Sequence, residues 1–473
     1  MITLYNTLTN RKEPLKPVRE GEIGIYACGP TVYDYFHIGN ARIFILFDVL
    51  RRYLTYRGYK VTFVQNFTDI DDKMINRAKE LGISVTELAA RFIQAYQEDA
   101  AALGVRPADH HPRATEHIPQ IIALIQKLLE KDLAYEIEGD IYFHVEAFPD
   151  YGKLSGQGLD ELQLGARVEI DARKKHPMDF ALWKKEKPGE PSWESPWGKG
   201  RPGWHIECSA MSMHYLGDTM DIHVGGQDLI FPHHENEIAQ SEGATGQTFV
   251  RHWIHAGYLN IDQEKMSKSL GNVLTIKELK KTTDPLVLRF FMLSAHYRSP
   301  INFSAEYLQQ ATRALERLHT LVYNLKDSIQ RLAKDFPDTA DEEHLLQSLE
   351  ENRKKFITVM DDDFNTAGAF AVLFELAKDT NIYLNRPQQP QRKVLELILE
   401  FYREVDEIFS YLPQQPQSTA LEKEVEALIA SREEARRRKD WALADSIRDQ
   451  LREKGIVLED TPRGVRWKAL TGK

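Results

Sequence analysis

A chain of 473 residues with 42% hydrophobic and 28% charged residues has the length for three or four domains and the composition of a globular protein. Its net charge of −10 argues against a protein that coats nucleic acid without specificity, and its two cysteines exclude a disulfide scaffold. The first residues lack a signal-peptide pattern and the apolar stretches are too short to span a bilayer, so we expect a cytoplasmic protein that does not bind membranes.

The first predicted elements form a strand–helix–strand unit. Residues 23–27 are expected to form a short buried strand, and a turn-rich segment follows at residues 28–31. A helix is expected from about Gly39, because apolar residues then recur with a helical period, and Gly58 suits a left-handed end to it. A second strand is predicted at residues 61–64. This unit indicates an α/β fold with a Rossmann-like parallel sheet.

The middle of the chain is expected to interrupt this sheet. Residues 84–134 have a helical pattern, and residues 135–200 break into short strands and turns rich in glycine and proline. We therefore interpret residues 113–200 as an insertion. Strands of the sheet are expected to resume at residues 220–224.

The last third of the chain is expected to be mostly helical. One apolar stripe indicates the core of a helical bundle and comprises Leu315, Leu318, Val322, Leu325, Ile329 and Leu332. Residues 412–418 read as a linker, followed by one strongly charged helix and a strand pair that ends at Trp467. The expected divisions of the chain are 1–112, 113–200, 201–262, 263–320, 321–412 and 418–473.

Two segments have the chemistry of a phosphate site. His37-Ile38-Gly39-Asn40 lies where the first helix begins, and the amides and dipole of a helix N-terminus favour a phosphate. Lys265-Met266-Ser267-Lys268-Ser269, here called the lysine loop, places two lysines and two hydroxyls in five residues. Each segment alone is also compatible with an ordinary surface turn. Their combination in one chain is the specific signal.

A possible metal site is indicated by the segment His233-His234-Glu235-Asn236-Glu237, which reads as the opening of a helix. His233 and Glu237 are four positions apart and project from one helical face. Cys28 and Cys208 would complete a set of two sulfurs, one nitrogen and one oxygen, which suits zinc. The spacing leaves His234 nearly as good a ligand as His233. The cysteines alone would also be compatible with inert core residues.

The C-terminal segment is basic within an acidic chain. From Ser431 onward it holds twelve Lys and Arg against eight Asp and Glu, a net charge of +4. The run from Arg436 to Trp441 is expected to open a helix that also carries Asp445 and Asp449. Basic side chains neutralise phosphates and an exposed tryptophan can stack on an unpaired base. A charged helix with Trp441 folded into its own small core is the alternative.

The pairing of His37-Ile38-Gly39-Asn40 with the lysine loop resembles the class I aminoacyl-tRNA synthetases. The resemblance implies that His37, Gly39 and Asn40 face ATP, and that Lys265 and Lys268 are catalytic, with Lys268 stabilising the departing pyrophosphate. One departure is that the family's signature ends in a second histidine, where this chain has Asn40. Asparagine can donate an N–H but cannot carry a positive charge, so this histidine's contribution must be weaker here or come from elsewhere.

Longer segments resemble the cysteinyl-tRNA synthetases over essentially the whole chain. These segments are Phe67–Lys73, Gly203–Cys208 and Phe231–Glu237. The resemblance implies one zinc ion on Cys28, Cys208, His233 and Glu237, together with Mg²⁺ accompanying ATP. It further implies substrate contacts by Gly29, Thr31, Thr68, Trp204, His223 and Asp228, and anticodon contacts by Arg436, Trp441, Asp445 and Asp460.

The implied activity is activation of L-cysteine by ATP to cysteinyl-adenylate, followed by transfer to the 3′-terminal ribose of tRNA(Cys). Zinc would serve discrimination, because a thiol is deprotonated by metal coordination and serine and alanine offer no comparable ligand. An apolar pocket would separate such substrates by only about 1–3 kcal/mol. The resemblance also implies a stem-contact region at 263–320 and an anticodon-binding domain at 418–473, and we expect a monomer.

Two other functions remain open at this point. A cysteine ligase acting on an amino sugar would share the same core but would have no use for the bundle and the basic C-terminal segment. A zinc protein that binds RNA without catalysis would leave the lysine loop and His37–Asn40 without a role.

Overall fold

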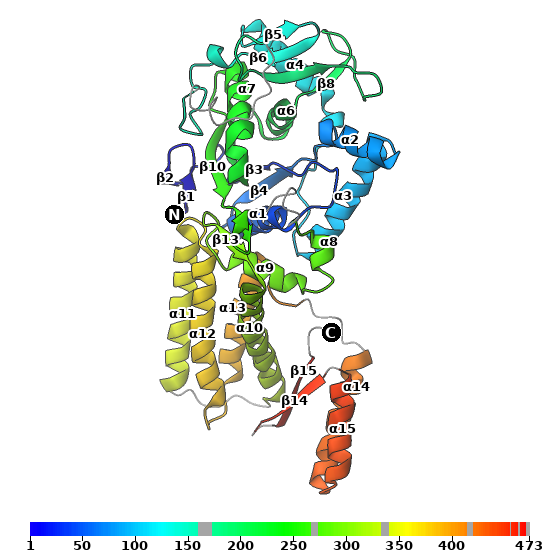
Figure 1. Ribbon diagram of the computed structural model, residues 1–473. Helices are drawn as coiled ribbons and strands as arrows, with labels where there is room; N and C mark the ends of the chain where they lie inside the picture. Colours follow the sequence, from blue (N-terminus) through cyan, green and yellow to red (C-terminus); the bar gives the residue numbers. More distant parts are fainter. Residues whose placement is uncertain are drawn as a thin grey trace.

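The computed structural model describes residues 1–158, 173–265, 273–332, 340–413, 420–454, 456–461 and 464–469. Figure 1 shows the central sheet and the insertion in the upper part of the molecule, a helical bundle below them and a small C-terminal unit to one side. Within the described residues, no helix combines the length and the apolar composition needed to cross a bilayer.

The centre of the upper part is a four-stranded sheet in the order β10-β9-β3-β4, in which every pairing is parallel. Its strands are β3 (Glu22–Ala27), β4 (Lys60–Gln65), β9 (Met220–Gly226) and β10 (Val250–Ala256). The predicted strand–helix–strand unit and parallel sheet are therefore confirmed. Because β4 lies on one side of β3 and β9 on the other, the carboxyl ends of β3 and β9 flank the crevice where such sheets bind ligands.

Helix α1 (Ile38–Tyr56) connects β3 to β4 and is buried along most of its length. Its interior lacks glycine and proline after the first turn, and Ile45, Leu46 and Leu50 are almost fully buried. Beyond its end, Gly58 has a φ of +90°, a conformation that glycine adopts without strain. The first turn of α1 thus starts at the carboxyl end of β3, beside the crevice.

The region between β4 and β9 contains further helices and the insertion. Its helices are α2 (Asp72–Leu81), α3 (Val85–Ala102), η1 (Ala114–Glu116), α4 (Ile118–Glu130), η2 (Val145–Ala147) and α6 (Trp204–Leu216). The antiparallel sheet of the insertion contains β5 (Ala134–Ile137), β6 (Asp140–Phe143), β7 (Phe180–Lys185) and β8 (Gly200–Pro202). Phe143, Leu182 and Trp183 are fully buried and belong to a core of its own. The helical pattern expected over residues 84–134 corresponds to α3 and α4, which are separated by residues 103–113 with Pro107 and Pro112.

Short elements lead from β9 and β10 to the bundle. They are η3 (Gln227–Leu229), the π-helical turn η4 (Ile230–His234), α7 (Glu235–Thr245), β11 (Leu259–Ile261), β12 (Glu264–Lys265), α8 (Ile276–Leu279), α9 (Pro285–Leu293) and β13 (Ile301–Phe303). Strand β11 pairs in parallel with β13 and antiparallel with β12. The N-terminal hairpin, β1 (Thr3–Asn6) and β2 (Arg11–Pro14), lies next to β10.

The bundle contains four long helices, as expected for this part of the chain. They are α10 (Ala305–Arg331), α11 (Ala340–Asp361), α12 (Thr366–Asn385) and α13 (Arg392–Phe409). The predicted apolar stripe of α10 faces the core: Leu315, Leu318 and Leu325 are at most 1% exposed. The tight turn between α11 and α12 places the buried Asp363 carboxylate against the backbone N–H of Tyr5 and the Tyr297 hydroxyl, which joins the bundle to the part of the molecule that holds the parallel sheet.

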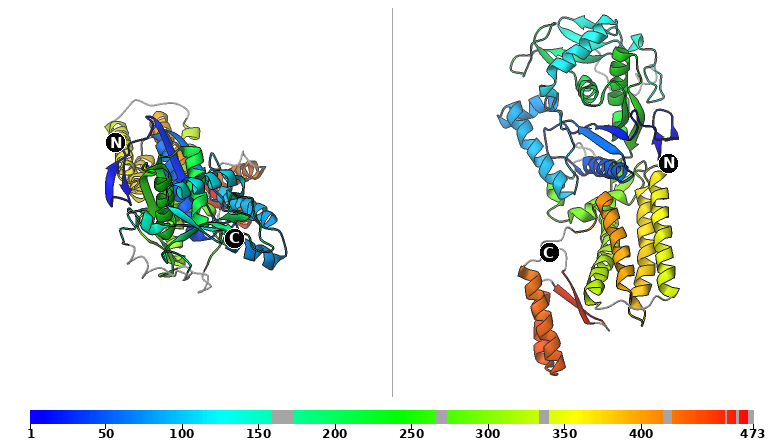
Figure 2. Two further views of the ribbon diagram at one scale, coloured as in Figure 1. Left: turned by 90° about the horizontal axis from the view of Figure 1, so that it is seen from above. Right: turned by 180° about the vertical axis from the view of Figure 1, so that it is seen from behind.

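The C-terminal unit has two helices where one was expected. Helix α14 (Ala420–Arg437) and helix α15 (Trp441–Glu453) precede the hairpin of β14 (Ile456–Thr461) and β15 (Gly464–Ala469), and in Figure 2 this unit again lies to one side of the bundle. The basic run therefore ends α14 instead of opening a helix. Lys439 breaks the helix with a φ of +61°, and the Asp440 carboxylate caps α15 by accepting from the Leu443 N–H. Most of the expected linker at 412–418 lies outside the described residues.

Candidate active site

Four potential metal ligands from distant parts of the chain converge at the carboxyl end of β3. Cys28 follows β3, Cys208 lies on α6, His233 lies in η4 and Glu237 lies in the first turn of α7. One donor atom from each of the four lies within 4.8 Å of the others. The two Sγ atoms are 3.9 Å apart, and His233 Nε2 is 3.0 Å from Glu237 Oε1.

The local backbone brings His233 and His234 inward together. The π-helical turn η4 leads into α7 after a cis peptide bond between Phe231 and Pro232. Both histidines are buried, and His234 Nε2 lies 3.4 Å from Cys28 Sγ. A second set, Cys28, His223, His234 and Glu237, consequently has donor atoms as close together as the first set. The ambiguity between His233 and His234 in the sequence is therefore also present in the structure.

Further histidines surround these donors and fix their ring orientations. His205 Nδ1 lies 2.8 Å from His233 Nδ1, which leaves His233 Nε2 directed at Glu237. His234 Nδ1 similarly lies 2.8 Å from His255 Nε2. His223 Nε2 is 2.9 Å from Glu237 Oε2, so the two oxygens of this carboxylate have different neighbours. A second ring nitrogen held in this way is the usual arrangement around a histidine that binds a metal.

Buried charges dominate the electrostatics of the cluster. Burial alone would raise the pKa of Glu237, but His223 and His233 lower it to about 2. Burial would likewise lower the pKa of His233, yet the Glu237 carboxylate raises it to about 10. The hydrogen bond from Cys28 lowers the pKa of Cys208 to about 6, whereas burial raises the pKa of Cys28. These shifts favour the thiolate of Cys208 and the carboxylate of Glu237, the forms in which both groups bind metal, whereas His233 must lose its proton to do so.

Trp204 covers the cluster on the side open to solvent. It is the first residue of α6, its indole stacks on His233 with ring centroids 4.4 Å apart, and it is 41% exposed. An aromatic side chain at this boundary can close over a small substrate without forming part of the core.

The three other predicted substrate contacts near Cys28 belong to the junction between β3 and β4. The Gly29 N–H donates to Asn66 Oδ1, and Thr31 forms a backbone bridge with Thr68. A Cβ at position 29 would lie only 1.6 Å from the Asn66 carbonyl oxygen, so glycine is required there by packing. This junction holds Cys28 in place, whether or not these residues also contact substrate.

The first turn of α1 is built by His37 and Asn40 themselves. His37 Nδ1 accepts from the Asn40 N–H, and Asn40 Oδ1 accepts from the His37 N–H, which together form a capping box. The Asn40 side-chain oxygen is thus used to stabilise the helix start. Gly39 lies between them, beside the crevice.

The segment after the lysine loop pairs with this turn. Thr275 forms a backbone bridge with His37, and the Ile38 N–H donates to the Leu274 carbonyl. Before the loop, Lys265 ends β12. The Lys265 side chain and residues 266–272, including Lys268, lie outside the described part of the chain. The structure therefore brings Leu274 and Thr275, which follow the loop, to His37.

Asp228 lies in η3, immediately beyond the carboxyl end of β9. Its carboxylate folds back over Gly226, where an added Cβ would lie 2.3 Å from Oδ1. Burial and this carboxylate raise the pKa of Tyr258, whose side chain is 40% exposed. Asp228 is thus at the crevice but on the β9 side of it, away from the junction that holds Cys28.

The predicted nucleic-acid residues lie together in the C-terminal unit. Arg436 lies in the last turn of α14, and Trp441 begins α15 with 59% of its surface exposed. The core alternative for Trp441 is therefore wrong. Asp445 forms an exposed ion pair of 3.4 Å with Arg448. Asp460 lies on β14, and its side chain is outside the described part of the structure.

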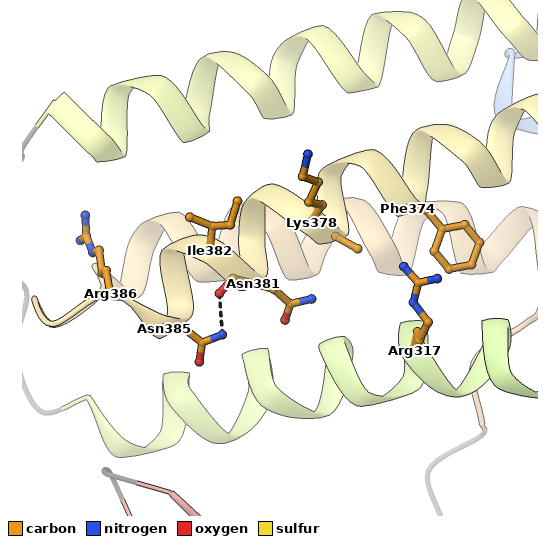
Figure 3. Close-up of a pocket in the computed structure, with 8 residues that line it drawn as sticks. Arg317, Phe374, Lys378, Asn381, Ile382, Asn385 and Arg386 are labelled. Atoms are coloured by element: carbon orange, nitrogen blue, oxygen red, sulfur yellow. Dashed lines mark hydrogen bonds between the residues drawn. The ribbon is translucent and has the colours of Figure 1, made fainter.

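A groove of about 690 Å³ lies far from these residues, between α10 and α12 of the bundle. Figure 3 shows Phe374, Lys378 and Ile382 of α12 across from Arg317 of α10. Its lining combines Phe374, Ala377 and Ile382 with basic and amide side chains, and holds no acid or histidine. It lacks the groups expected of a catalytic site.

Sequence reasoning missed several residues that organise the site. Asn66 anchors Gly29, and His255 orients His234 while its Nδ1 lies 2.8 Å from Thr7 Oγ1. A histidine within the otherwise apolar end of β10, residues 253–256, was the available signal for His255. Thr7 offered none, because it is a single hydroxyl in a hairpin far away in sequence.

Three family models match successive parts of this chain. Residues 14–313 match a model described as the tRNA synthetases class I (C) catalytic domain. Residues 355–412 match a DALR domain, and residues 418–467 match a cysteinyl-tRNA ligase anticodon binding domain.

Full-length relatives and solved structures agree with these matches. The chain is 56% identical to the cysteine–tRNA ligases of Anoxybacillus flavithermus and Geobacillus thermodenitrificans over 467 residues, which is 99% of each chain. Methionyl-tRNA synthetase of Mycobacterium tuberculosis, solved with methionyl-adenylate, aligns with a TM-score of 0.59 at 15% identity, over 82% of this chain and 89% of that chain. A leucyl-tRNA synthetase from Agrobacterium radiobacter aligns with a TM-score of 0.61 at 12% identity, over 84% and 85% of the two chains. These structural matches support the α/β fold.

Proposed function

This chain belongs to the family of cysteine–tRNA ligases, and on that premise we propose that Cys28, Cys208, His233 and Glu237 hold a zinc ion that selects the amino acid. The activity of the family, ATP-dependent attachment of cysteine to transfer RNA, is the activity of this chain. A match to an anticodon binding domain argues against an amino-sugar ligase, and the match to a class I catalytic domain argues against a binding protein without catalysis.

The donor set fits zinc in chemistry and in spacing. Two thiolates, one imidazole and one carboxylate are ligands that zinc accepts in a tetrahedral site. Tetrahedral bonds of about 2.3 Å to sulfur would place two sulfurs about 3.8 Å apart. The Sγ atoms of Cys28 and Cys208 are separated by 3.9 Å. This convergence of four donors is the observation that carries the proposal.

The set with two sulfurs is favoured over the alternative set with His223 and His234. The alternative contains only one sulfur, and zinc sites with thiolate ligands are the better match to this ion's softness. His223 also already bonds Glu237 Oε2, which is the role of a residue that orients a ligand.

When bound, zinc would stabilise the thiolate of the substrate and so distinguish cysteine from serine and alanine. The residues of the chain prepare that contact. His205 orients His233, and His223 holds one oxygen of Glu237, so that the other oxygen faces Cys28 at 3.5 Å. Trp204 closes the open side and excludes water from a small substrate.

For the nucleotide we propose that ATP, accompanied by Mg²⁺, lies along the first turn of α1. Gly39 allows the close approach, the dipole of the helix N-terminus favours the phosphates, and His37 donates to a phosphate oxygen. Lys265 and Lys268 provide the positive charge that the missing second histidine would have supplied. The Asn40 oxygen that caps the helix supports a structural role for this residue.

For the nucleic acid we propose that the C-terminal unit reads the anticodon of tRNA(Cys) through Arg436, Trp441, Asp445 and Asp460. The exposure of Trp441 supports stacking on an unpaired base. Catalytic and anticodon-binding matches occur on one chain, so a single copy holds both proposed sites, and we propose that it acts as a monomer in the cytoplasm.

Replacement of one sulfur tests the metal proposal. Cys208→Ser should lose bound zinc, measured as metal per chain, together with cysteine-dependent ATP–pyrophosphate exchange. Ser212→Ala is the matched control, since Ser212 is buried on the same helix and donates only to the Ser209 carbonyl. Full zinc and normal exchange in Cys208→Ser would overturn the assignment.

A further inference from the structure

Arg42 is a buried arginine whose guanidinium is surrounded by backbone carbonyls. It lies in the second turn of α1, five positions after His37, and is fully buried. Its Nη1 donates to the carbonyls of Gly257 and Tyr258 at 2.9 and 2.7 Å. Its Nη2 donates to the carbonyls of Tyr297 and Ser299 at 3.2 and 2.5 Å, and more weakly to that of His296 at 3.4 Å.

This arrangement differs from an ordinary buried ion pair. In the described part of the chain no carboxylate contributes to the electrostatics of this guanidinium, and burial lowers the pKa of Arg42 to about 10. The buried charge is instead balanced by carbonyl dipoles, through charge-assisted hydrogen bonds. Retaining an unpaired charge in the core is costly, so the position is under strong constraint.

The five carbonyls belong to two segments that Arg42 ties to α1. The first, Gly257–Tyr258, joins β10 to β11. The second, residues 296–299, leads into β13. The two segments also touch directly, since the Gly257 N–H donates to the Tyr297 carbonyl and a Cβ at Gly257 would lie 2.6 Å from the Arg298 carbonyl.

The segments that meet at Arg42 carry the two halves of the nucleotide site. Helix α1 starts with His37 and Gly39, whereas β11 pairs with β12, which ends at Lys265 where the lysine loop begins. Strand β11 is held from its other side by β13, which the 296–299 segment leads into. Arg42 is thus the side chain that joins the start of α1 to both strands that support the lysine loop.

We propose that Arg42 is a positioning residue for cysteine activation, which sets the separation between the His37–Asn40 turn and β12, the strand that leads into the lysine loop. The inference rests on the proposed roles of these two segments toward ATP. The proposed role of Arg42 concerns only the activation of cysteine by ATP, because both segments are proposed to contact the phosphates of ATP. The hydrogen bonds of Arg42 include none to the four proposed zinc ligands.

Lysine at this position retains the charge but cannot perform the role. A guanidinium has a fixed fork of donors that can bridge two chain segments at once, whereas an ammonium is a point charge with three donors. Arg42→Lys therefore keeps a cation among the carbonyls and loosens the junction. Arg289→Lys is the control, since Arg289 is equally buried and bridges the carbonyls of Leu103 and Phe409 and the Asp48 carboxylate, away from the lysine loop.

The test compares both variants with the full-length parent protein. For Arg42→Lys we expect kcat of ATP–pyrophosphate exchange to fall and KM for ATP to rise, with a combined loss of about 100-fold, the scale for displacing a group by about 1 Å. KM for cysteine, zinc per chain and the rate of transfer from preformed cysteinyl-adenylate to tRNA should stay unchanged. Arg289→Lys should retain the parent exchange kinetics.

Three results would overturn the proposal. The first is ATP–pyrophosphate exchange by Arg42→Lys at the parent rate. The second is a rise in KM for cysteine as large as the rise in KM for ATP. The third is an equal loss of exchange activity in Arg289→Lys, which would indicate general destabilisation. If Arg42→Lys fails to fold, Gly257→Ala opens the same junction from the other segment and should show the same selectivity for ATP. Failure of the zinc proposal would appear separately, as normal zinc and exchange in Cys208→Ser.

Discussion

Substitution of Gly29 by alanine should disrupt the zinc cluster through packing alone. The added Cβ would lie 1.6 Å from the Asn66 carbonyl oxygen and 2.8 Å from its carbon, where non-bonded atoms need about 3.5 Å. Both contacts are with backbone, so no side-chain rotation relieves them. The carboxyl ends of β3 and β4 must separate by more than about 1 Å, and Cys28, the preceding residue, moves with them.

The magnitude follows from this separation. Overpacking typically costs about 1–3 kcal/mol, and we expect about 3 kcal/mol in the free energy of unfolding because the hydrogen bond from Gly29 to Asn66 Oδ1 is lost as well. A displacement of about 1 Å in a group that positions substrate lowers the rate about 100-fold. Gly29→Ala should therefore lose both stability and exchange activity, with reduced zinc per chain.

Urea denaturation, zinc content and cysteine-dependent ATP–pyrophosphate exchange measure the three effects. Gly158→Ala is the control, because an added Cβ there meets no atom within 4 Å. The reasoning is refuted if Gly29→Ala unfolds at the parent urea concentration and retains parent activity. It is also refuted if stability falls while zinc and activity remain, since the shift would then not reach Cys28.

Two further predictions address the interdomain core and the C-terminal unit. Asp48 is buried among three arginines, including Arg289 at 2.8 Å. Burial alone would raise the pKa of Asp48, but these arginines lower it. Asp48→Asn should cost about 3–5 kcal/mol at neutral pH. Because the pKa of Asp48 is depressed in the folded state, the stability difference between parent and variant should be fully present above about pH 4 and should diminish as the pH falls further. A difference in thermal unfolding between parent and variant that does not change with pH would contradict the assignment. Trp441→Ala should lower kcat/KM for tRNA about 10- to 100-fold through lost stacking, while ATP–pyrophosphate exchange stays unaffected. Tyr307→Ala is the control, since it removes a similarly exposed aromatic ring from α10 and should leave kcat/KM for tRNA unchanged. Equal effects of the two substitutions would count against the stacking role.

The parallel sheet and the bundle core were predictable because their signals are local and repeated. A strand, a helix and a strand within about 45 residues specify a parallel crossover, and the stripe around Leu318 specifies the buried face of α10. The break at Lys439 was not predictable in the same way. Helical period and charge continue across it, and only the left-handed backbone of that residue, with the Asp440 cap, divides α14 from α15.

The candidate site was predictable in its residue types but not in its exact membership. A spacing of four made His233 a better partner of Glu237 than His234, but the π-helical turn directs both rings inward. The reason for Gly29 could not be read from sequence either, because it depends on the approach of Asn66 from the next strand. Contacts between segments distant in sequence leave no periodic signal.

The convergence of Cys28, Cys208 and Glu237 also has a consequence for the newly made chain. Cys28 is separated from Cys208 by 180 positions and from Glu237 by 209, so the early part of the chain holds one of the four donors alone. At about 5–20 residues per second, Cys28 waits roughly 10–40 s on the ribosome before Glu237 has been added. Parallel pairing of β3 with β9 is delayed equally, because contacts so distant in sequence form slowly. Cys28 therefore spends this interval without the full set of its partner ligands, and the proposed zinc site cannot be completed until Glu237 has been added.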